Sequence, residues 1–286
     1  MTTPTPQQRV HGALLGLAAG DALGATLEFM PPEEIRRRHG VHTEITGGGA
    51  FGWRPGQGTD DTDLTIAVAR AYADGYQLGA VTEHFLRWYR GRPRDIGGMT
   101  AASLGRIADG EEPLAAGAAA TAAARGGGAG AGAGNGSLMR ALPTGLARSH
   151  PDRCAREAAE ISAVTHADPR CVHACVAYTA IVSALVEGTP VPEALQAGRR
   201  HHRCHHRRPP RRPRRRPGRA HPLGAAAGIR PGDQRARPGA ARPAQPPPQR
   251  GAATGMTSDS ARERDSFVWT DPDTGLLDQI GRPAAR

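Results

Sequence analysis

The stretch QQRVHGALLGLAAGDALG, residues 7–24, decides the fold class because its apolar side chains recur at helical spacing. These apolar positions are Val10, Leu14, Leu15, Leu17, Ala18 and Leu23. The glycines at 12, 16 and 20 lower helix propensity, and their spacing predicts that another helix approaches this face closely. We therefore expect a helix over residues 7–24 that packs against other helices.

The same helical spacing recurs along most of the chain up to Gly198, whereas the alternation typical of strands is scarce. Further helices are predicted over residues 31–39, 59–76, 81–90, 98–109, 114–124, 137–147, 151–164 and 170–187, and another begins near 192. Two glycine-rich loops, 41–58 and 126–136, interrupt them. The sequence predicts an all-α domain of antiparallel helices over residues 7–198.

Charge divides the chain after Gly198. Residues 1–198 hold 17 arginines and 20 acidic residues, a net charge of −3, whereas residues 199–286 hold 20 arginines and 7 acidic residues, a net charge of +13. Only seven Ile, Leu, Val or Phe residues occur after Gly198, too few to offset the entropy cost of ordering that segment. We therefore expect residues 199–286 to be a disordered basic tail.

Two accounts of this tail remain open. It is either a native arginine-rich arm that binds polyanions such as nucleic acid without sequence specificity, or an out-of-frame translation of a GC-rich gene. The absence of lysine from the whole chain and the abrupt break inside a predicted helix favour the second account.

The motif GTDDTD, residues 58–63, lies where a glycine-rich loop meets a predicted helix. One interpretation is a helix start, with Thr59 as N-cap and acids in the first turn; the cap contributes about 1 kcal/mol. The other is a cation site, because adjacent carboxylates repel each other unless a cation lies between them. Carboxylate and hydroxyl oxygens are ligands that Mg²⁺ and Mn²⁺ accept.

Three further acids lie in motifs of their own. Asp21 and Glu28 are seven residues apart, so they share a helical face if the helix over residues 7–24 continues. Solvated surface acids are the alternative there. Asp95 precedes the helix predicted at residue 98, where a single acid is typical of a helix cap.

Taken in order, four strings of this sequence resemble the ADP-ribosylglycohydrolases, most closely those that remove ADP-ribose from arginine. The strings are GALLGLAAGDALGATLEF (12–29), GGG (47–49) followed by PGQGTDDT (55–62), AGNGSLMR (133–140) and VTHAD (164–168). The resemblance covers about residues 9–198, and the ordered combination is specific whereas each string alone is not. It implies an all-α fold with a dinuclear Mg²⁺ or Mn²⁺ centre in a cleft.

The resemblance also implies roles for the acids and for Thr59. Thr59, Asp60 and Asp61 correspond to the family's first set of metal ligands. Glu28 corresponds to the acid near the cleft, and Asp95 falls where arginine-specific members have an acid proposed to act on the ribose. We therefore expect Glu28 and Asp95 to be the catalytic acids.

Substrate contacts are implied at the second glycine-rich loop. Asn135, Gly136 and Ser137 would face the ADP-ribose, and His166 falls in the family's Thr-His motif. For His166 we expect a structural role or a place at the edge of the substrate rather than a catalytic one.

The sequence departs from the family in its last third. Members complete the metal site with a late D-x-D-T motif at a glycine-flanked helix start, and here only Asp271-Pro272-Asp273-Thr274 has that spacing. Its proline and its context make coincidence the preferred interpretation, so half a metal centre is expected. The chain is then either a metal-dependent ADP-ribosylarginine hydrolase or an inactive, truncated ADP-ribose-binding domain with a polyanion-binding tail.

The remaining expectations concern the cell and the partners. Cys154, Cys171, Cys175 and Cys204 form no CxxC pair, which predicts reduced thiols in the cytoplasm. No uninterrupted apolar run is long enough for a membrane span, so no membrane partner is expected. We expect a monomer that acts on an ADP-ribosylated protein or a small ADP-ribosyl substrate.

Overall fold

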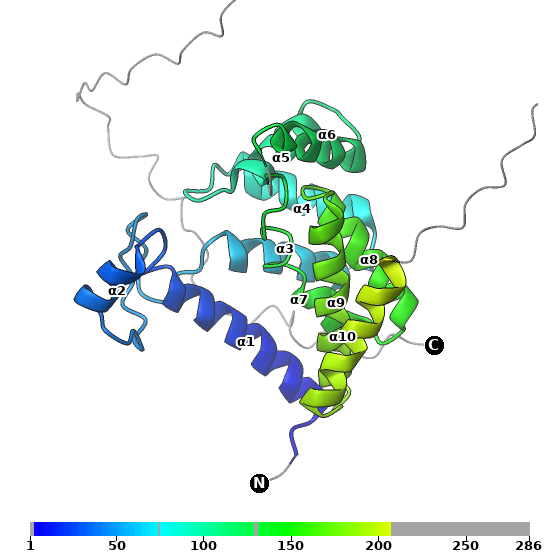
Figure 1. The fold of residues 1–286 in the computed structure, drawn as a ribbon, viewed down its shortest axis with the longest axis horizontal. Coiled ribbons are helices and arrows are strands. Elements are labelled where there is room, and N and C mark those ends of the chain that lie inside the picture. Colours follow the sequence, from blue (N-terminus) through cyan, green and yellow to red (C-terminus); the bar gives the residue numbers. More distant parts are fainter. Residues whose placement is uncertain (1–2, 74, 129–130, 207–286) are drawn as a thin grey trace, which may run out of the picture. The chain divides into compact units, whose positions relative to one another are not determined.

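The computed structural model describes residues 3–73, 75–128 and 131–206 (Figure 1). Most of them are helical, in the order α1 (Pro6–Gly24), α2 (Pro32–Arg38), α3 (Asp60–Ala73), α4 (Leu78–Arg90), α5 (Gly98–Ala108), α6 (Pro113–Arg125), α7 (Leu142–Ala147), α8 (Pro151–Ala163), α9 (Pro169–Val186) and α10 (Val191–His206). These residues contain no strand, and one isolated antiparallel bridge joins Gly48 to Trp53. The predicted all-α fold is confirmed.

Side chains at the helix starts explain several of these boundaries. Thr5 Oγ1 accepts a hydrogen bond from Gln8 N at the start of α1 (3.2 Å), and Gln8 Oε1 accepts one from Thr5 N (2.8 Å). This reciprocal pair satisfies two amides that the helix itself leaves free. At the starts of α6 and α9, the carboxylates of Glu112 and Asp168 accept hydrogen bonds from backbone amides of the first turn.

Two helix boundaries differ from the prediction. The helix expected over residues 137–147 is shorter, because α7 begins only at Leu142 and carries Pro143 in its first turn. Proline is accepted there but breaks a helix interior. At the other end, α10 continues to His206, beyond the expected boundary at Gly198, because arginine is a good helix former and α10 packs along α9. Residues 207–286, which include the spacing at 271–274, lie outside the described residues.

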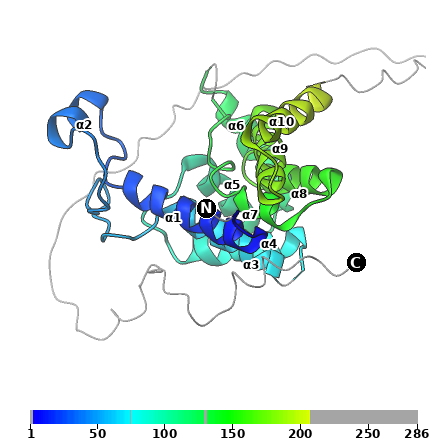
Figure 2. The same ribbon diagram turned by 90° about the horizontal axis from the view of Figure 1, so that it is seen from below.

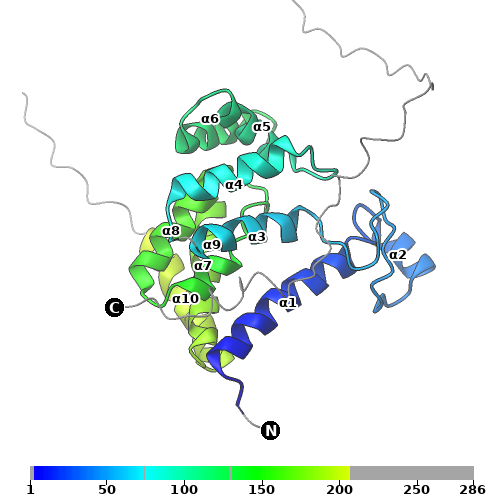
Figure 3. The ribbon, with the colours of Figure 1, turned by 180° about the vertical axis from the view of Figure 1, so that it is seen from behind.

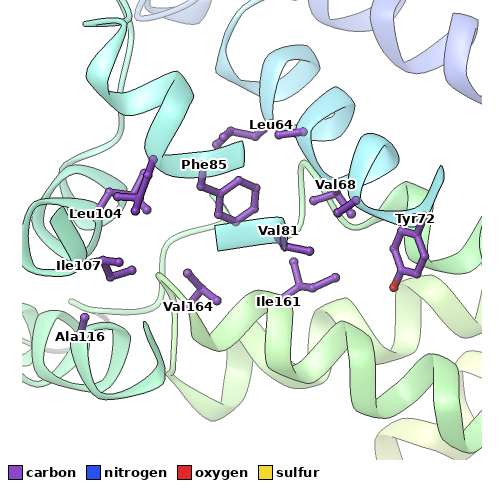
Figure 4. Packing of buried hydrophobic residues seen from close by; sticks show 13 residues of the cluster. Leu64, Val68, Tyr72, Val81, Phe85, Leu104, Ile107, Ala116, Ile161 and Val164 are labelled. Carbon is purple, nitrogen blue, oxygen red and sulfur yellow. The ribbon is translucent and has the colours of Figure 1, made fainter. Parts of the chain in front are cut away.

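The main core lies among α3, α4, α5, α6 and α8. Figure 4 shows the side chains that meet there: Leu64, Val68, Tyr72, Val81, Phe85, Leu104, Ile107, Ala116, Ile161 and Val164. Helix α4 lies between α3 and the α5–α6 pair (Figure 3). Buried residues occur around most of the circumference of α3, so this helix is fixed by packing along its length.

A buried polar network joins α3 to α8 at the edge of this core. Glu157 is 1% exposed and accepts hydrogen bonds from Tyr72 Oη, Arg148 Nε and Arg153 Nε, each at 2.8 Å. The Arg148 guanidinium also lies over the Tyr72 ring, 4.8 Å from its centroid. A buried carboxylate with this many donors holds its two helices in register.

Helices α1, α7 and α9 enclose a second, smaller core. By length and hydropathy α9 is the one described helix that could cross a membrane, and five of its side chains are buried inside the protein: Cys171, Cys175, Val176, Thr179 and Val182. The three described cysteine side chains form no disulfide, as expected.

Among the described residues, the glycine face of α1 is open, with no other helix against it. A Cβ placed at Gly12, Gly16 or Gly20 would meet nothing within 4 Å among these residues. Helix α2 and the loops around it lie beyond the C-terminal end of α1 (Figure 2). Part of the open face lines the cavity described next.

Candidate active site

Asp21, close to the C-terminal end of α1, holds the first turn of α3 in place. Its Oδ2 accepts hydrogen bonds from the N–H groups of Thr59 (2.8 Å) and Thr62 (3.1 Å), and its Oδ1 accepts one from Thr59 Oγ1 (2.8 Å). The Thr62 hydroxyl donates to Oδ2 as well. The first amides of a helix have no partner within it and carry partial positive charge, so a carboxylate is favourable there. Asp21 therefore fixes the GTDDTD motif against α1.

Thr59 is also the N-cap that the sequence predicted. Its Oγ1 accepts a hydrogen bond from Asp61 N (3.3 Å) while it donates its own proton to Asp21. The two interpretations of the motif are thus compatible, because the hydroxyl caps the helix while the carboxylate of Asp61 lines a cavity.

This cavity has a volume of about 500 Å³ and lies beside the junction of α1 and α3. It is lined by the open face of α1, the turn after it and the start of α3: Gly16, Leu17, Gly20, Asp21, Gly24, Ala25, Leu27, Glu28, Thr59 and Asp61. Helix α1 ends at Gly24 and the chain turns, with Leu27 N donating to Gly24 O (2.8 Å), so Asp21 and Glu28 do not share one continuous helical face. Glu28 nevertheless reaches the same cavity as Asp21.

Four carboxylates make up an acidic cluster here: Glu28, Asp60, Asp61 and Asp95. Burial, followed by the charges of neighbouring carboxylates, raises the pKa of Glu28 and of Asp60 to about 7 and that of Asp61 to about 6. Burial is also the main cause that raises the pKa of Asp95, with Asp21 second. Asp95 contributes to the shifts of the other three, so the structure brings these four predicted residues together.

The acidic cluster has the chemistry of a cation site. Within the described residues it forms no ion pair with arginine or histidine, and Glu28 Oε2 is buried without a hydrogen-bond partner. Its donors are oxygens, which suit Mg²⁺ or Mn²⁺. No three His, Cys, Asp or Glu side chains in the described part of the chain are already arranged to hold an ion. The donor set therefore fits a divalent cation without forming a closed cage.

The second glycine-rich loop packs against His166. Gly136 has no room for a side chain, because a Cβ there would lie 2.9 Å from Cε1 of His166. Ser137 is buried and accepts a hydrogen bond from Ser162 Oγ (2.9 Å), whereas Asn135 is exposed. The structure thus brings the four predicted substrate residues together, and it gives Ser137 an internal contact.

His166 is buried and uncharged at neutral pH. Burial, and secondarily Arg140, lowers its pKa to about 4. The Thr165 hydroxyl accepts a hydrogen bond from Arg140 Nη2 (2.7 Å) and lies 2.7 Å from Nδ1 of His166. The Thr165 hydroxyl therefore links Arg140 to the imidazole of His166, beside the glycine loop.

Arg140 was not singled out in the sequence analysis, although it ends the string AGNGSLMR. It is fully buried, donates to the carbonyl of Gly136 (2.9 Å), and lies over the ring of Phe85, 4.5 Å from its centroid. Burial lowers its pKa to about 10, and the charge of Asp60 opposes that shift. A lone arginine after the apolar pair Leu138-Met139 was the available signal for a buried cation behind the site.

Comparisons with known proteins show the family of this chain. A family model described as ADP-ribosylglycohydrolase matches residues 2–258. The chain is 35% identical over 194 residues to the ADP-ribosyl-[dinitrogen reductase] glycohydrolase of Rhodospirillum rubrum, a match that covers 66% of this chain and 61% of that protein. It is 34% identical over 221 residues to the ADP-ribosylarginine hydrolase Tri1 of Pseudomonas putida (strain GB-1), covering 70% of this chain and 54% of the relative.

A solved structure described as an ADP-ribosylglycohydrolase-related protein complex is similar with a TM-score of 0.55 and 32% sequence identity, over 68% of this chain and 62% of that one. The chain therefore spans between half and two thirds of the length of these relatives.

Proposed function

Because the chain belongs to the ADP-ribosylglycohydrolase family, we propose that its cavity binds ADP-ribosylated arginine and positions the N-glycosidic bond for metal-dependent hydrolysis. The observation that carries this proposal is a cavity lined by Asp21, Glu28 and Asp61, in which the buried Glu28 Oε2 has no hydrogen-bond partner among the described residues. The relative named as an ADP-ribosylarginine hydrolase supports arginine as the linkage.

Hydrolysis breaks the bond between the anomeric carbon of the ribose and a guanidine nitrogen. The oxygen of a water molecule joins the carbon, and a proton must reach the departing nitrogen. Glu28 suits this proton transfer, because a pKa of about 7 leaves it partly protonated near neutral pH. Asp95, nearly buried at the start of α5, is the second acid and would hold the ribose hydroxyls.

Thr59, Asp60 and Asp61 are the residues that would hold a divalent cation, Mg²⁺ or Mn²⁺. Such an ion, when bound, would orient the ribose hydroxyls and lower the pKa of a water molecule. Asp21 keeps these three side chains in place through the first turn of α3. These three residues would supply oxygen donors for one cation.

The glycine-rich loop before Arg140 suits the phosphates of ADP-ribose. Its glycines let a ligand approach the backbone amides closely, and Asn135 is exposed beside them. His166 packs against the glycines of this loop and would lie at the edge of the substrate.

Calorimetric titration with Mn²⁺ tests the cation site. We expect weak binding by the parent, none by Asp60→Ala, and unchanged binding by Asp152→Ala, an exposed acid in the first turn of α8 that serves as the matched control. Equal Mn²⁺ binding by the parent and Asp60→Ala would place the ion elsewhere and contradict the assignment.

Release of ADP-ribose from ADP-ribosylarginine tests the reaction. If the chain binds one cation where the family uses two, it should release ADP-ribose at a rate close to that of the uncatalysed reaction. Each role that the second cation would fill, such as activating water, lowers the barrier by several kcal/mol. A chimera that carries the C-terminal part of the Rhodospirillum rubrum relative after residue 198 should gain metal-dependent release, which Asp60→Ala, Asp61→Ala and Glu28→Ala remove. Robust release of ADP-ribose by the present chain would refute the expectation of half a metal centre. It would favour Asp271, Asp273 and Thr274 as additional metal ligands.

A second candidate function rests on the charge of the tail. The net charge of +13 after Gly198 favours an inactive ADP-ribose-binding domain that also binds polyanions. Its signature would be nucleic-acid binding that weakens steeply with salt and disappears when residues 207–286 are removed.

A further inference from the structure

Three aromatic rings lie in a row next to the acidic cluster. The ring centroids of Phe29 and Phe51 are 6.0 Å apart in an edge-to-face arrangement, and those of Phe51 and Trp53 are 5.8 Å apart. Phe29 is 74% exposed, whereas Trp53 is 7% exposed, so the row runs from the surface into the protein. We call these three residues the aromatic row.

The outermost ring, that of Phe29, is attached to backbone in an unfavourable conformation. Phe29 has a φ of 62°, in the left-handed region that is unfavourable for a residue with a bulky side chain. Its large apolar ring gains little burial in return. Strained backbone that persists in a well-packed structure is concentrated at ligand sites. Phe29 directly follows Glu28, which lines the cavity.

The support beneath Phe29 is rigid. Thr26 Oγ1 donates to the carbonyl of Gly47 (3.0 Å), and a Cβ at Gly49 would lie within 2.3 Å of the carbonyl oxygen of Ala25. The turn that carries Phe29 is thus packed directly on the loop that carries Phe51 and Trp53. This close packing fixes the aromatic row before any ligand binds.

The surroundings of the aromatic row favour a planar cation. The guanidinium of Arg94 lies 5.8 Å from the centroid of the Trp53 ring and donates to the carbonyls of Phe51 and Gly52, so one guanidinium already packs against the inner end. Two carboxylates of the acidic cluster are chain neighbours of these residues, because Glu28 precedes Phe29 and Asp95 follows Arg94. Aromatic faces and carboxylates both attract a cationic ligand. A neutral aromatic ligand would not gain this electrostatic attraction.

From this geometry we infer that Phe29 receives the guanidinium of the arginine to which ADP-ribose is attached, and so determines selectivity for that linkage. The inference rests on the proposed function, which puts Glu28 at the bond that is cut. Phe29 is then at the arginine end of the substrate, whereas the adenine lies at the far end of the ADP-ribose. A linkage without a guanidinium, such as that to a serine hydroxyl, would gain nothing from this ring.

Binding of two ligands to the full chain tests the inference. Calorimetry with ADP-ribosylarginine and with free ADP-ribose should show that Phe29→Ala weakens ADP-ribosylarginine roughly three- to thirty-fold, the range of a cation–π contact, and leaves ADP-ribose unchanged. Phe29→Tyr should bind both like the parent. Val41→Ala, which trims an exposed apolar side chain outside the aromatic row, should change neither.

The outcomes separate this inference from the proposed function. Unchanged ADP-ribose binding by Phe29→Ala shows that the variant is folded, so a selective loss supports the inference. Equal weakening of both ligands by Phe29→Ala, or no weakening of either, overturns the inference alone. A parent chain that binds neither ligand overturns the proposed function and the inference with it.

Discussion

Replacing Asp60 by asparagine tests whether the acidic cluster stores electrostatic repulsion. Folding raises the pKa of Asp60 from 3.8 to about 7, first through burial and then through neighbouring carboxylates. A carboxyl group with a higher pKa in the folded state contributes stability that is present below the unfolded pKa and is lost as pH rises through about 7. The ionised Asp60 therefore destabilises the metal-free protein above neutral pH, and asparagine removes that penalty.

The magnitude follows from the size of the shift and the position of the residue. At 1.36 kcal/mol per pKa unit, the full shift corresponds to roughly 4 kcal/mol. Asp60 is partly exposed, so solvent screening reduces this to about 1–2 kcal/mol. Loss of a negative charge at the start of α3 weakens the favourable interaction with the helix dipole, which lowers the free energy of unfolding by about 0.5 kcal/mol. We expect the variant to be more stable than the parent by about 1 kcal/mol at about pH 8, and by less at about pH 4.5.

Chemical denaturation of chelator-treated protein at both pH values measures this difference. Asp152→Asn is the matched control, because it also removes an acid from the first turn of a helix but lies outside the acidic cluster. The control should be slightly destabilised at the higher pH. A stability difference between Asp60→Asn and the parent that does not grow with pH, or that Asp152→Asn reproduces, would refute the stored repulsion.

Three other expectations concern the packing and the tail. Glu157→Gln should lower the free energy of unfolding by about 3 kcal/mol, because it leaves the largely buried Arg148 without its charge partner. Arg153→Gln changes a half-exposed donor to the same carboxylate, so it should lower the free energy of unfolding by less than about 1 kcal/mol in the same denaturation assay. Gly117→Ala should cost more than about 2 kcal/mol, because its Cβ would lie within 2 Å of the carbonyl oxygen of Ala163; the control Gly79→Ala, in open space on another helix, should raise thermal stability slightly. Translation of the gene in the other frames beyond codon 198 should show a glycine-flanked D-x-D-T and an Ala-rich helix, and frames that hold only stops would establish the tail as native.

Local chemistry made most helices predictable from the sequence. The apolar periodicity and the prolines at helix starts gave α8 and α9 nearly at their observed bounds. The GTDDTD motif predicted both the start of α3 and its polar cap, because these depend on neighbours along the chain. Prediction failed at α7, where the pattern continued before Leu142 but proline geometry did not permit a longer helix.

The parts of the site that the sequence did not predict depend on distant contacts or on unusual backbone. The hydrogen bonds of Asp21 reach residues 38 and 41 positions away, and no local pattern specifies such a pairing. The chain turns after Gly24, and Phe29 then adopts a left-handed backbone conformation that the apolar pattern does not specify. Arg140 was missed because a buried arginine is rare, and its burial depends on carbonyls supplied by other segments.

The electrostatics of α3 link the fold to the proposed chemistry. Its N-terminus carries about half a positive charge, which Asp21 already uses through its two hydrogen bonds. That half charge cannot balance Asp60, Asp61 and Glu28 as well, and the buried Arg140 donates through its Nη atoms to carbonyls and to Thr165 rather than to these carboxylates. The repulsion that remains is opposed by the packing of α3 in the main core. A cation that binds the acidic cluster would relieve it, so the same carboxylates that lower the stability of the metal-free domain provide the binding energy for the ion.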